Sequence, residues 1–473
     1  MRKLIYLFGI WTLFISTAFA QFGQNKVQYK DYDWFYIQTK HFDIYFAKGG
    51  EKIAEFTASV SEKALEQYQK EFNYEIDKRI TLIVYNSHND FQETNVTDEY
   101  TGQGVGGFTE PFKNRVVFPF EGSYQKFAHV IRHELVHAVM QDMYFGGSIQ
   151  NIISKGITLQ LPHWFMEGSA EFFSQGWETN TDMFIRNAIL SESLPDINRL
   201  SGYLGYRGGQ AVFKYLADTY GIQKLGELIN KIQGLGGLEP ALKATFGISM
   251  EELNERWKKS MKKEYWPDIG FRYDPDEFAK RLTDNSKGYG FYNTSPAISP
   301  QGDKIAFISD RDIFLDVYIM DANDGKILKK VVESGKTNDF EDLNLLYPSL
   351  TWSPDNKRIA LSTKSGGGDE ISIIDVENDD NYKLPFKMPG IDGIEVLKRI
   401  KANYPKTDVV VVTAFGTIEN AVKAMRLGAY DYLTKNLSFA FTDHEKEGLA
   451  EFFNYAFFYG YSEFIPDLHF YKI

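Results

Sequence analysis

Hydrophobic and polar positions repeat with two different periods in the first part of the chain. The runs DWFYIQTKHFDIYFA (33–47) and RITLIVYNS (79–87) are rich in β-branched and aromatic residues, which is typical of strands. Between them, GEKIAEFTASVSEKALEQYQKEF (50–72) carries apolar residues at helical spacing. GQGVGGFTE (102–110) and NRVVFPF (114–120) predict two further short strands.

Helical spacing dominates the part of the chain that follows. It begins at about Tyr124, with Ser123 as the expected N-cap, and it extends over most of residues 164–265. A small sheet followed by helices indicates an α+β domain, which we assign to residues 21–270.

After about residue 270 the pattern changes to short strands and turns. The run NTSPAISPQGDKIAFISD (293–310) returns as LYPSLTWSPDNKRIALST (346–363), and Ser299 aligns with Ser353 at an offset of 54 residues. Repetition at this period predicts propeller blades. The repeated strand resembles the signature of the TolB-type (WD40-like) β-propeller family. The resemblance implies a partial propeller of about two blades over residues 271–387, fewer than a closed propeller needs.

Residues 388–435 predict a helix, a strand, a second helix and a second strand. This segment resembles the C-terminal half of a response-regulator receiver domain. The matching motifs are Met-Pro-Gly at 388–390, Thr-Ala at 413–414 after an apolar strand, and GAYDYL at 428–433 leading to Lys435. The resemblance implies a truncated α/β receiver fragment.

Two features of the C-terminal region limit its expected function. Pro385 stands where the receiver family has its phosphorylated aspartate, and without a carboxylate nucleophile no aspartyl phosphate forms. The tail, residues 436–473, resembles the C-terminus of a menaquinone-pathway chorismate dehydratase and implies no catalytic residue. We therefore expect no phosphoacceptor, and the chain after about residue 387 has the character of a fusion or assembly scar. The whole chain is expected to be multidomain.

The N-terminus predicts export. In residues 1–20 a positive start (Arg2, Lys3) precedes an apolar stretch and the small-residue cleavage site Ala-Phe-Ala at 18–20, which is typical of a secretory signal peptide. An uncleaved membrane anchor is the alternative. No later segment is long enough to span a bilayer, so we expect no stable span after cleavage and a periplasmic, extracellular or cell-surface location.

Composition narrows the classes of partner. Hydrophobic residues make up 43% and charged residues 25% of the chain, which is an ordinary globular balance. The net charge is −12, and no Lys/Arg block forms a footprint for nucleic acid, which excludes that partner. There are no cysteines, so disulfides are also excluded.

The run FAHVIRHELVHAVMQ (127–141) carries the clearest chemistry. On a helix His133 and His137 lie on one face, one turn apart, and can hold one metal ion. Glu134 is rotated by about 100°, so it can reach a water on that metal without binding the metal itself. Catalytic zinc usually takes three protein ligands, so this helix is short of one.

A second run, PHWFMEGSAEFF (162–173), completes the pattern. Together the two runs resemble the gluzincin metallopeptidases, the peptidase MA-like group, and the resemblance extends over roughly residues 35–265. It implies one Zn²⁺ ion with Glu167 as its third ligand. It also implies that Glu171 orients a zinc-bound histidine through a hydrogen bond. Gly168 is expected to let this helix pack closely against the helix of His133.

Four other side chains remain open to two interpretations. Tyr206, or its neighbour Tyr203, is the candidate donor to the reaction's oxyanion, as a tyrosine or histidine is in many relatives, but aromatic packing at a loop-to-helix junction is the favoured interpretation. His129 and His163 are expected to be packing or surface histidines rather than ligands.

The sequence therefore predicts an exported zinc-dependent peptidase that hydrolyses peptide bonds through metal-activated water, with Glu134 as general base. An edge strand, either 104–110 or 114–120, is expected to bind the peptide or protein substrate in an extended form. One alternative is a catalytically inactive periplasmic or surface scaffold whose propeller recruits a protein partner. A second alternative, a two-component phosphorelay protein, is disfavoured by Pro385.

Overall fold

The structure is a computed structural model, and part of the chain is described in it. The described residues are 31–95, 97, 101–102, 104–110, 115–146, 159–287, 290–334, 340, 342–343, 350–365, 368–378, 380–384, 398, 401–402, 410–413 and 431–434. The predicted signal peptide and the C-terminal tail lie outside these residues. Among the described helices, none is both long and apolar enough to cross a membrane.

A mixed five-stranded sheet opens the chain, with the order β1-β2-β3-β5-β4. The pairs β2–β3 and β3–β5 are parallel, whereas β1–β2 and β4–β5 are antiparallel. The segment 114–120 contains β5, which is an inner strand, so the prediction that it offers a free edge is wrong. The two edge strands of this sheet are β1 and β4. The strands are β1 Trp34–Gln38, β2 Phe42–Ala47, β3 Ile80–Tyr85, β4 Phe108–Glu110 and β5 Arg115–Pro119.

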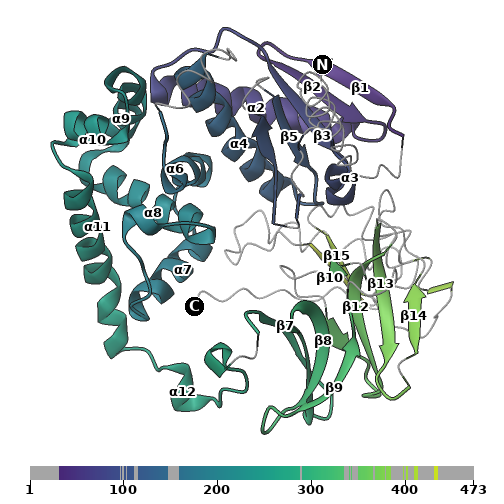
Figure 1. Cartoon of the computed structure of the whole chain (residues 1–473). Helices are drawn as coiled ribbons and strands as arrows, with labels where there is room; N and C mark the ends of the chain where they lie inside the picture. The colour runs from purple at the N-terminus through teal and green to yellow at the C-terminus, as the bar shows by residue number, and fades with distance from the viewer. Residues whose placement is uncertain are drawn as a thin grey trace, which may run out of the picture.

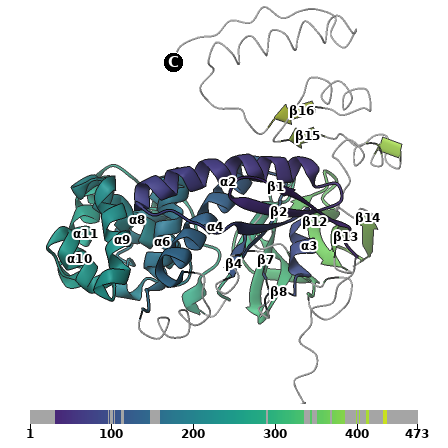
Figure 2. The same ribbon diagram turned by 90° about the horizontal axis from the view of Figure 1, so that it is seen from above.

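Different helices cover the two faces of this sheet. Neighbouring residues of a strand point to opposite faces, so Val116 packs into the main core with α2 and α4, while Val117 packs against Phe91 of α3. Figure 2 shows α2 running alongside β1 and β2. Ser123 caps α4 as predicted, its hydroxyl accepting from the backbone N–H of Lys126. The helices are α2 Glu51–Phe72, α3 His88–Gln92 and α4 Tyr124–Phe145.

The helical half of the domain lies on the other side of α4 from the sheet (Figure 1). Its helices confirm the predicted helical region. They are α6 His163–Gln175, α7 Thr179–Leu190, α8 Tyr203–Tyr220, α9 Ile222–Leu235, α10 Leu238–Phe246 and α11 Met250–Tyr265.

Helices α6 and α8 touch backbone to backbone at two glycines. A Cβ atom on Gly168 would lie 2.4 Å from the backbone carbon of Gly209, and one on Gly209 would lie 2.2 Å from the carbonyl oxygen of Trp164. The expectation that Gly168 packs against the helix of His133 is therefore wrong. Gly168 is rotated by about 100° from Glu167, so when Glu167 faces α4 the glycine faces α8.

Two antiparallel sheets follow and confirm the sequence repeat as a structural one. The hydroxyl of Ser299 accepts from the N–H of Lys304, and that of Ser353 accepts in the same way from Arg358. The sheets share one apolar core, and the described residues form no closed propeller. The first sheet holds β6 Asn293–Ile298, β7 Lys304–Asp312, β8 Phe314–Asp321 and β9 Ile327–Val332. The second holds β10 Asp342–Leu343, β11 Leu350–Trp352, β12 Arg358–Ser365, β13 Gly368–Asp375 and β14 Asn381–Leu384.

Helix α3 contacts the second of these sheets. Asn89 Nδ2 donates to Asp369 Oδ2 at 2.9 Å, and Lys364 Nζ donates to the side-chain oxygen of Gln92. The amide nitrogen of Gln92 donates in turn to the backbone carbonyl of Thr101 at 2.8 Å. The second sheet is thereby joined to the segment that leads into β4, and Figure 1 shows α3 above β12 and β13.

The receiver-like segment is described only at its two predicted strands and a few single positions. Strands β15 (Val410–Thr413) and β16 (Asp431–Thr434) pair in parallel. The helix predicted between these strands lies outside the described residues. The other receiver motifs, Pro385 included, lie outside the described residues.

Candidate metal centre

His133, His137 and Glu167 bring three donor atoms to one point. His133 Nε2 lies 3.2 Å from His137 Nε2 and 3.2 Å from Glu167 Oε2, and His137 Nε2 lies 3.3 Å from the same oxygen. A tetrahedral ion at about 2.0–2.2 Å from its ligands needs donor atoms about 3.3 Å or slightly more apart. The donor set and its spacing therefore fit zinc, with one position left for water.

The electrostatics of this cluster favour a cation. Burial opposes the charge on Glu167, but hydrogen bonds and charge from His133 and His137 outweigh burial and hold the pKa of Glu167 well below its usual range. Burial likewise opposes a charge on His133, but Glu167 and Glu171 raise its pKa to about 10. The pocket thus stabilises positive charge at His133. A bound metal ion would take the place of that proton, because a ligating imidazole must be neutral.

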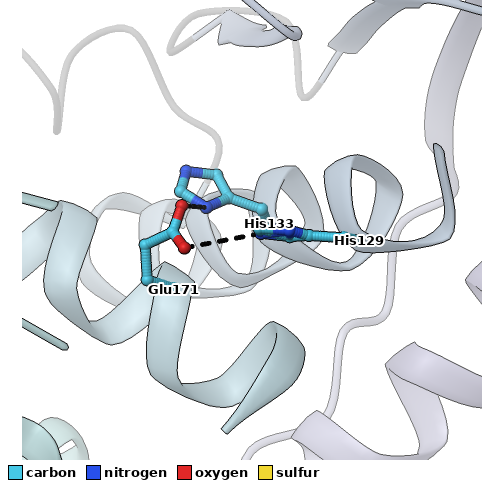
Figure 3. A group of neighbouring side chains, drawn as sticks. All are labelled: His129, His133 and Glu171. Carbon is cyan, nitrogen blue, oxygen red and sulfur yellow. Dashed lines mark ion pairs between the residues drawn. The ribbon is translucent and has the colours of Figure 1, made fainter. Parts of the chain in front are cut away.

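Glu171 holds the opposite nitrogen of His133. Its Oε1 lies 3.2 Å from His133 Nδ1. Figure 3 shows one carboxylate oxygen of Glu171 facing the ring of His133 and the other facing the ring of His129. A partner on Nδ1 fixes the tautomer and the ring orientation, which leaves Nε2 to face the metal position. Glu171 thus lies where the family resemblance places an orienting carboxylate.

A second cluster shares His133. The ligating atoms of His129, His133 and Glu171 all lie within 4.8 Å of one another. The guanidinium of Arg207, however, lies 3.0 Å from Glu171 Oε2 and would repel a second cation there. Burial lowers the pKa of His129 to about 4, so this imidazole is neutral and serves as a partner of Glu171. The set that contains His137 is the better metal site.

Glu134 lies beside the metal position without joining either cluster of candidate ligands. Its side chain is buried, and its Oε2 lies 2.8 Å from Thr109 Oγ1. The same hydroxyl lies 3.0 Å from the backbone carbonyl of Glu134, and it has one proton to donate. Thr109 belongs to β4, and a Cβ on Gly107 would lie 3.2 Å from Glu134 Cγ, so the edge strand passes directly by this carboxylate.

The structure separates the two candidate tyrosines. The ring of Tyr206 stacks on His133, with 6.0 Å between ring centroids, and meets His163 edge-on at 5.4 Å. Burial, followed by the charges of Glu167 and Glu134, raises the pKa of Tyr206, so it stays a protonated donor. Tyr203 is 55% exposed, and its hydroxyl accepts from Arg207 Nε at 3.0 Å.

Thr109 and Arg207 are site residues that no sequence motif indicates. Thr109 reaches Glu134 only because β4 pairs with β5 beside α4. Arg207 follows Tyr206 directly, and its contact with Glu171 depends on the packing of α8 against α6. Neither position belongs to a local pattern of apolar spacing or to a metal-ligand motif.

Comparison with known families finds two domains in the chain. Residues 60–263 match the Peptidase MA superfamily, and residues 355–441 match the response regulator receiver domain. The first match contains the residues that the sequence pointed to, which are His133, Glu134, His137, Glu167, Glu171 and Tyr206. The second begins within the sheet of β12–β14, whose antiparallel pairing differs from the parallel pair β15–β16.

The curated relatives match short pieces. The transcriptional regulator NtrC of Klebsiella pneumoniae is 32% identical over 77 residues, which cover 16% of this chain and 16% of that protein. The response regulator FleR of Pseudomonas aeruginosa is 50% identical over 48 residues, which cover 10% of each chain. The chain thus spans about a sixth or less of the length of these two relatives.

Solved structures resemble the chain only distantly. An M1 zinc metallopeptidase from Deinococcus radiodurans has 12% identity and a TM-score of 0.29, with 48% of this chain and 51% of that chain covered. Aminopeptidase A from Legionella pneumophila, in complex with aspartic acid, has 12% identity and a TM-score of 0.27, with 61% and 31% covered. TolB from Acinetobacter baumannii has 24% identity and a TM-score of 0.17, with 20% and 21% covered.

Proposed function

We propose that this chain is a zinc-dependent peptidase, with His133, His137 and Glu167 as metal ligands and Glu134 as general base. The observation that carries the proposal is the convergence of three donor atoms, 3.2–3.3 Å apart, beside a buried carboxylate that is not among them. The match of residues 60–263 to the Peptidase MA superfamily supports it.

Each residue has a role in the proposed hydrolysis. Zinc, when bound, supplies a Lewis acid that makes water a nucleophile near neutral pH and polarises the scissile carbonyl. Glu134 accepts the proton of the attacking water and passes it to the leaving amine. Tyr206, whose phenol stays protonated, donates a hydrogen bond to the developing oxyanion. Thr109 holds the carboxylate of Glu134 towards β4.

Strand β4 is the proposed binding edge for the substrate. In the described part of the sheet it pairs only with β5, so its outer edge has backbone groups that can pair with an extended peptide. Because Thr109 contacts Glu134 from the same strand, a peptide added to this edge passes next to the proposed base. We therefore propose peptides or unfolded protein segments as substrates.

The proposed location is outside the cytoplasm, and residues 1–20 are its support. Fractionation of cells that produce the full chain tests it: the product is expected outside the cytoplasm and shortened at about residue 20. Recovery of the full-length chain in the cytoplasm alone would contradict export. A protein partner bound through the two blade-like sheets is a further proposal, testable by cross-linking the exported chain.

The test of the peptidase uses the full chain with zinc and a diverse peptide library analysed by mass spectrometry. Glu134→Gln should retain zinc at the wild-type stoichiometry, measured by elemental analysis, and lose hydrolysis. The matched control is Glu255→Gln, which neutralises an exposed glutamate on α11 and should remain active. Full activity of Glu134→Gln would overturn the proposed mechanism, and absence of zinc from the wild-type protein would overturn the metal site.

A further inference from the structure

We infer that Arg207 is a positioning residue of the metal centre, which it reaches through Glu171. It locks Glu171 onto the non-ligating nitrogen of His133 and thereby sets how tightly the site holds its ion. The inference rests on the proposed metal site, and its test separates the two.

The guanidinium of Arg207 is held by three helices. Nη1 donates to Glu171 Oε2 on α6 and to Thr181 Oγ1 on α7, both at 3.0 Å, and Nε donates to the hydroxyl of Tyr203 on its own helix α8, also at 3.0 Å. The side chain is 16% exposed and stacks over the ring of Tyr203 at 5.2 Å. The guanidinium group suits this position, because it is planar and its N–H donors point in several fixed directions, so it can form several hydrogen bonds at once.

The two oxygens of Glu171 have separate tasks. Oε2 accepts from Arg207 at 3.0 Å and from Gln175 Nε2 at 2.8 Å, and it lies 3.5 Å from His129 Nε2. Oε1 lies 3.2 Å from His133 Nδ1. Rotation of the carboxylate would break all the contacts of Oε2 at once. Oε1 is therefore kept on His133, and the ring of His133 keeps Nε2 aimed at His137 and Glu167.

The charge of Arg207 matters as much as its hydrogen bonds. Glu171 is 5% exposed, and a buried carboxylate is costly unless it is paired. The guanidinium of Arg207, 3.0 Å from Glu171 Oε2, supplies the paired positive charge. Without Arg207 the carboxylate loses its only arginine partner among the described residues. A displaced Glu171 would orient His133 less well, and loss of such a partner typically weakens metal binding about 10–100-fold.

A purely structural role for Arg207 is the competing explanation, because it also ties α7 and α8 to α6. The variants are chosen to separate the two roles. Arg207→Met removes both the charge and the planar set of N–H donors, whereas Arg207→Lys keeps the charge but not the planar set of donors. Arg186→Met is the matched control: Arg186 pairs with Asp182 and Asp268, and these ion pairs include none of the metal-site residues in the part of the chain that the structure describes.

The measurements are the rate of zinc transfer from the full chain to a chromogenic chelator and the visible spectrum of the cobalt-substituted protein. Arg207→Met should lose zinc about 10–100-fold faster and shift the cobalt bands, with Arg207→Lys between it and the wild type. Arg186→Met should match the wild type in both readouts, even if it lowers the melting temperature equally. Unchanged zinc release and cobalt bands in Arg207→Met would overturn the inference.

A double-mutant cycle gives a second, independent test. Glu171→Gln removes the charge that Arg207 compensates, so adding Arg207→Met to it should change zinc release little. Full additivity of the two substitutions would overturn the inference, because a structural role does not depend on Glu171. If the wild-type chain binds no zinc, the proposed function itself is overturned. That outcome differs from one in which the chain binds zinc but the substitution of Arg207 does not change zinc release, which overturns only the present inference.

Discussion

Thr109 on the edge strand β4 and Glu134 on helix α4 share a hydrogen bond, with 2.8 Å between Thr109 Oγ1 and Glu134 Oε2. The strand proposed to bind the substrate thus also holds the proposed general base. A hydrogen bond to a charged group is worth about 1.5–3 kcal/mol, so this contact is strong enough to select one orientation of the carboxylate.

Thr109→Val is therefore expected to lower kcat about tenfold or more while leaving zinc content unchanged. The hydroxyl is lost and the volume is nearly kept, so Glu134 stays in place on α4 but turns more freely. Steady-state kinetics and elemental analysis provide the measurement. Thr351→Val, on the exposed position of β11, is the control. Wild-type kcat in Thr109→Val would show that the bond does not orient the base.

Gly209→Ala is expected to destabilise the domain by about 1–3 kcal/mol, because the new Cβ would lie 2.2 Å from the carbonyl oxygen of Trp164. The strain must separate α6 from α8, and α6 carries Glu167. Chemical denaturation and zinc affinity should therefore both report a loss. Gly234→Ala on α9 is the control: its Cβ meets open space, so it should stabilise by up to about 1 kcal/mol. Equal effects of the two changes would refute this packing argument.

Zinc is expected to raise the melting temperature of the wild-type chain, because a ligand that binds only the folded state stabilises it by mass action. At a free zinc concentration about 100 times the Kd, the gain is about 2.7 kcal/mol. His137→Ala should lose most of this gain. His41→Ala should keep it, since His41 pairs with Glu62 on α2 and belongs to no candidate metal cluster. An equal zinc effect in His137→Ala would exclude His137 as a ligand.

Glu71 gives a pH-dependent prediction away from the metal centre. Burial raises the pKa of Glu71, and its Oε2 has no hydrogen-bond partner among the residues that the structure describes. The folded chain therefore binds this proton more tightly than the unfolded chain. Stability is greatest below the unfolded pKa and falls as pH rises through the folded pKa.

The variant Glu71→Gln should remove this loss, while its side-chain oxygen still accepts from Gln67, which donates to Glu71 Oε1 at 2.9 Å. Melting temperatures measured between pH 4 and 8 should show the wild type losing stability relative to the variant as pH rises. A difference that does not change with pH would contradict a raised pKa.

Sequence alone predicts those parts of the fold and the site that depend on residues close together in the chain. His133 and His137 lie one helical turn apart, so their convergence needs only a helix, and the small sheet and the repeated strands follow from short periodic runs. Glu167 required a family resemblance, since spacing does not show which helices touch. The prediction that Gly168 packs against the helix of His133 is wrong for the same reason. The position of Thr109 in the site depends on the pairing of β4 with β5, and that of Arg207 depends on the packing of α8 against α6.

The contact between α3 and the second sheet bears on whether the proposed metal site can be separated from the rest of the chain. Asn89 and Gln92 are hydrogen-bonded to Asp369 and Lys364, respectively, whereas the proposed metal ligands lie on α4 and α6. A chain shortened to the first domain should thus keep the means to hold zinc but lose a tether on the segment leading to Thr109. If the proposed site binds zinc, the first domain alone should be sufficient for binding, whereas the position of the proposed substrate edge should depend on the longer chain.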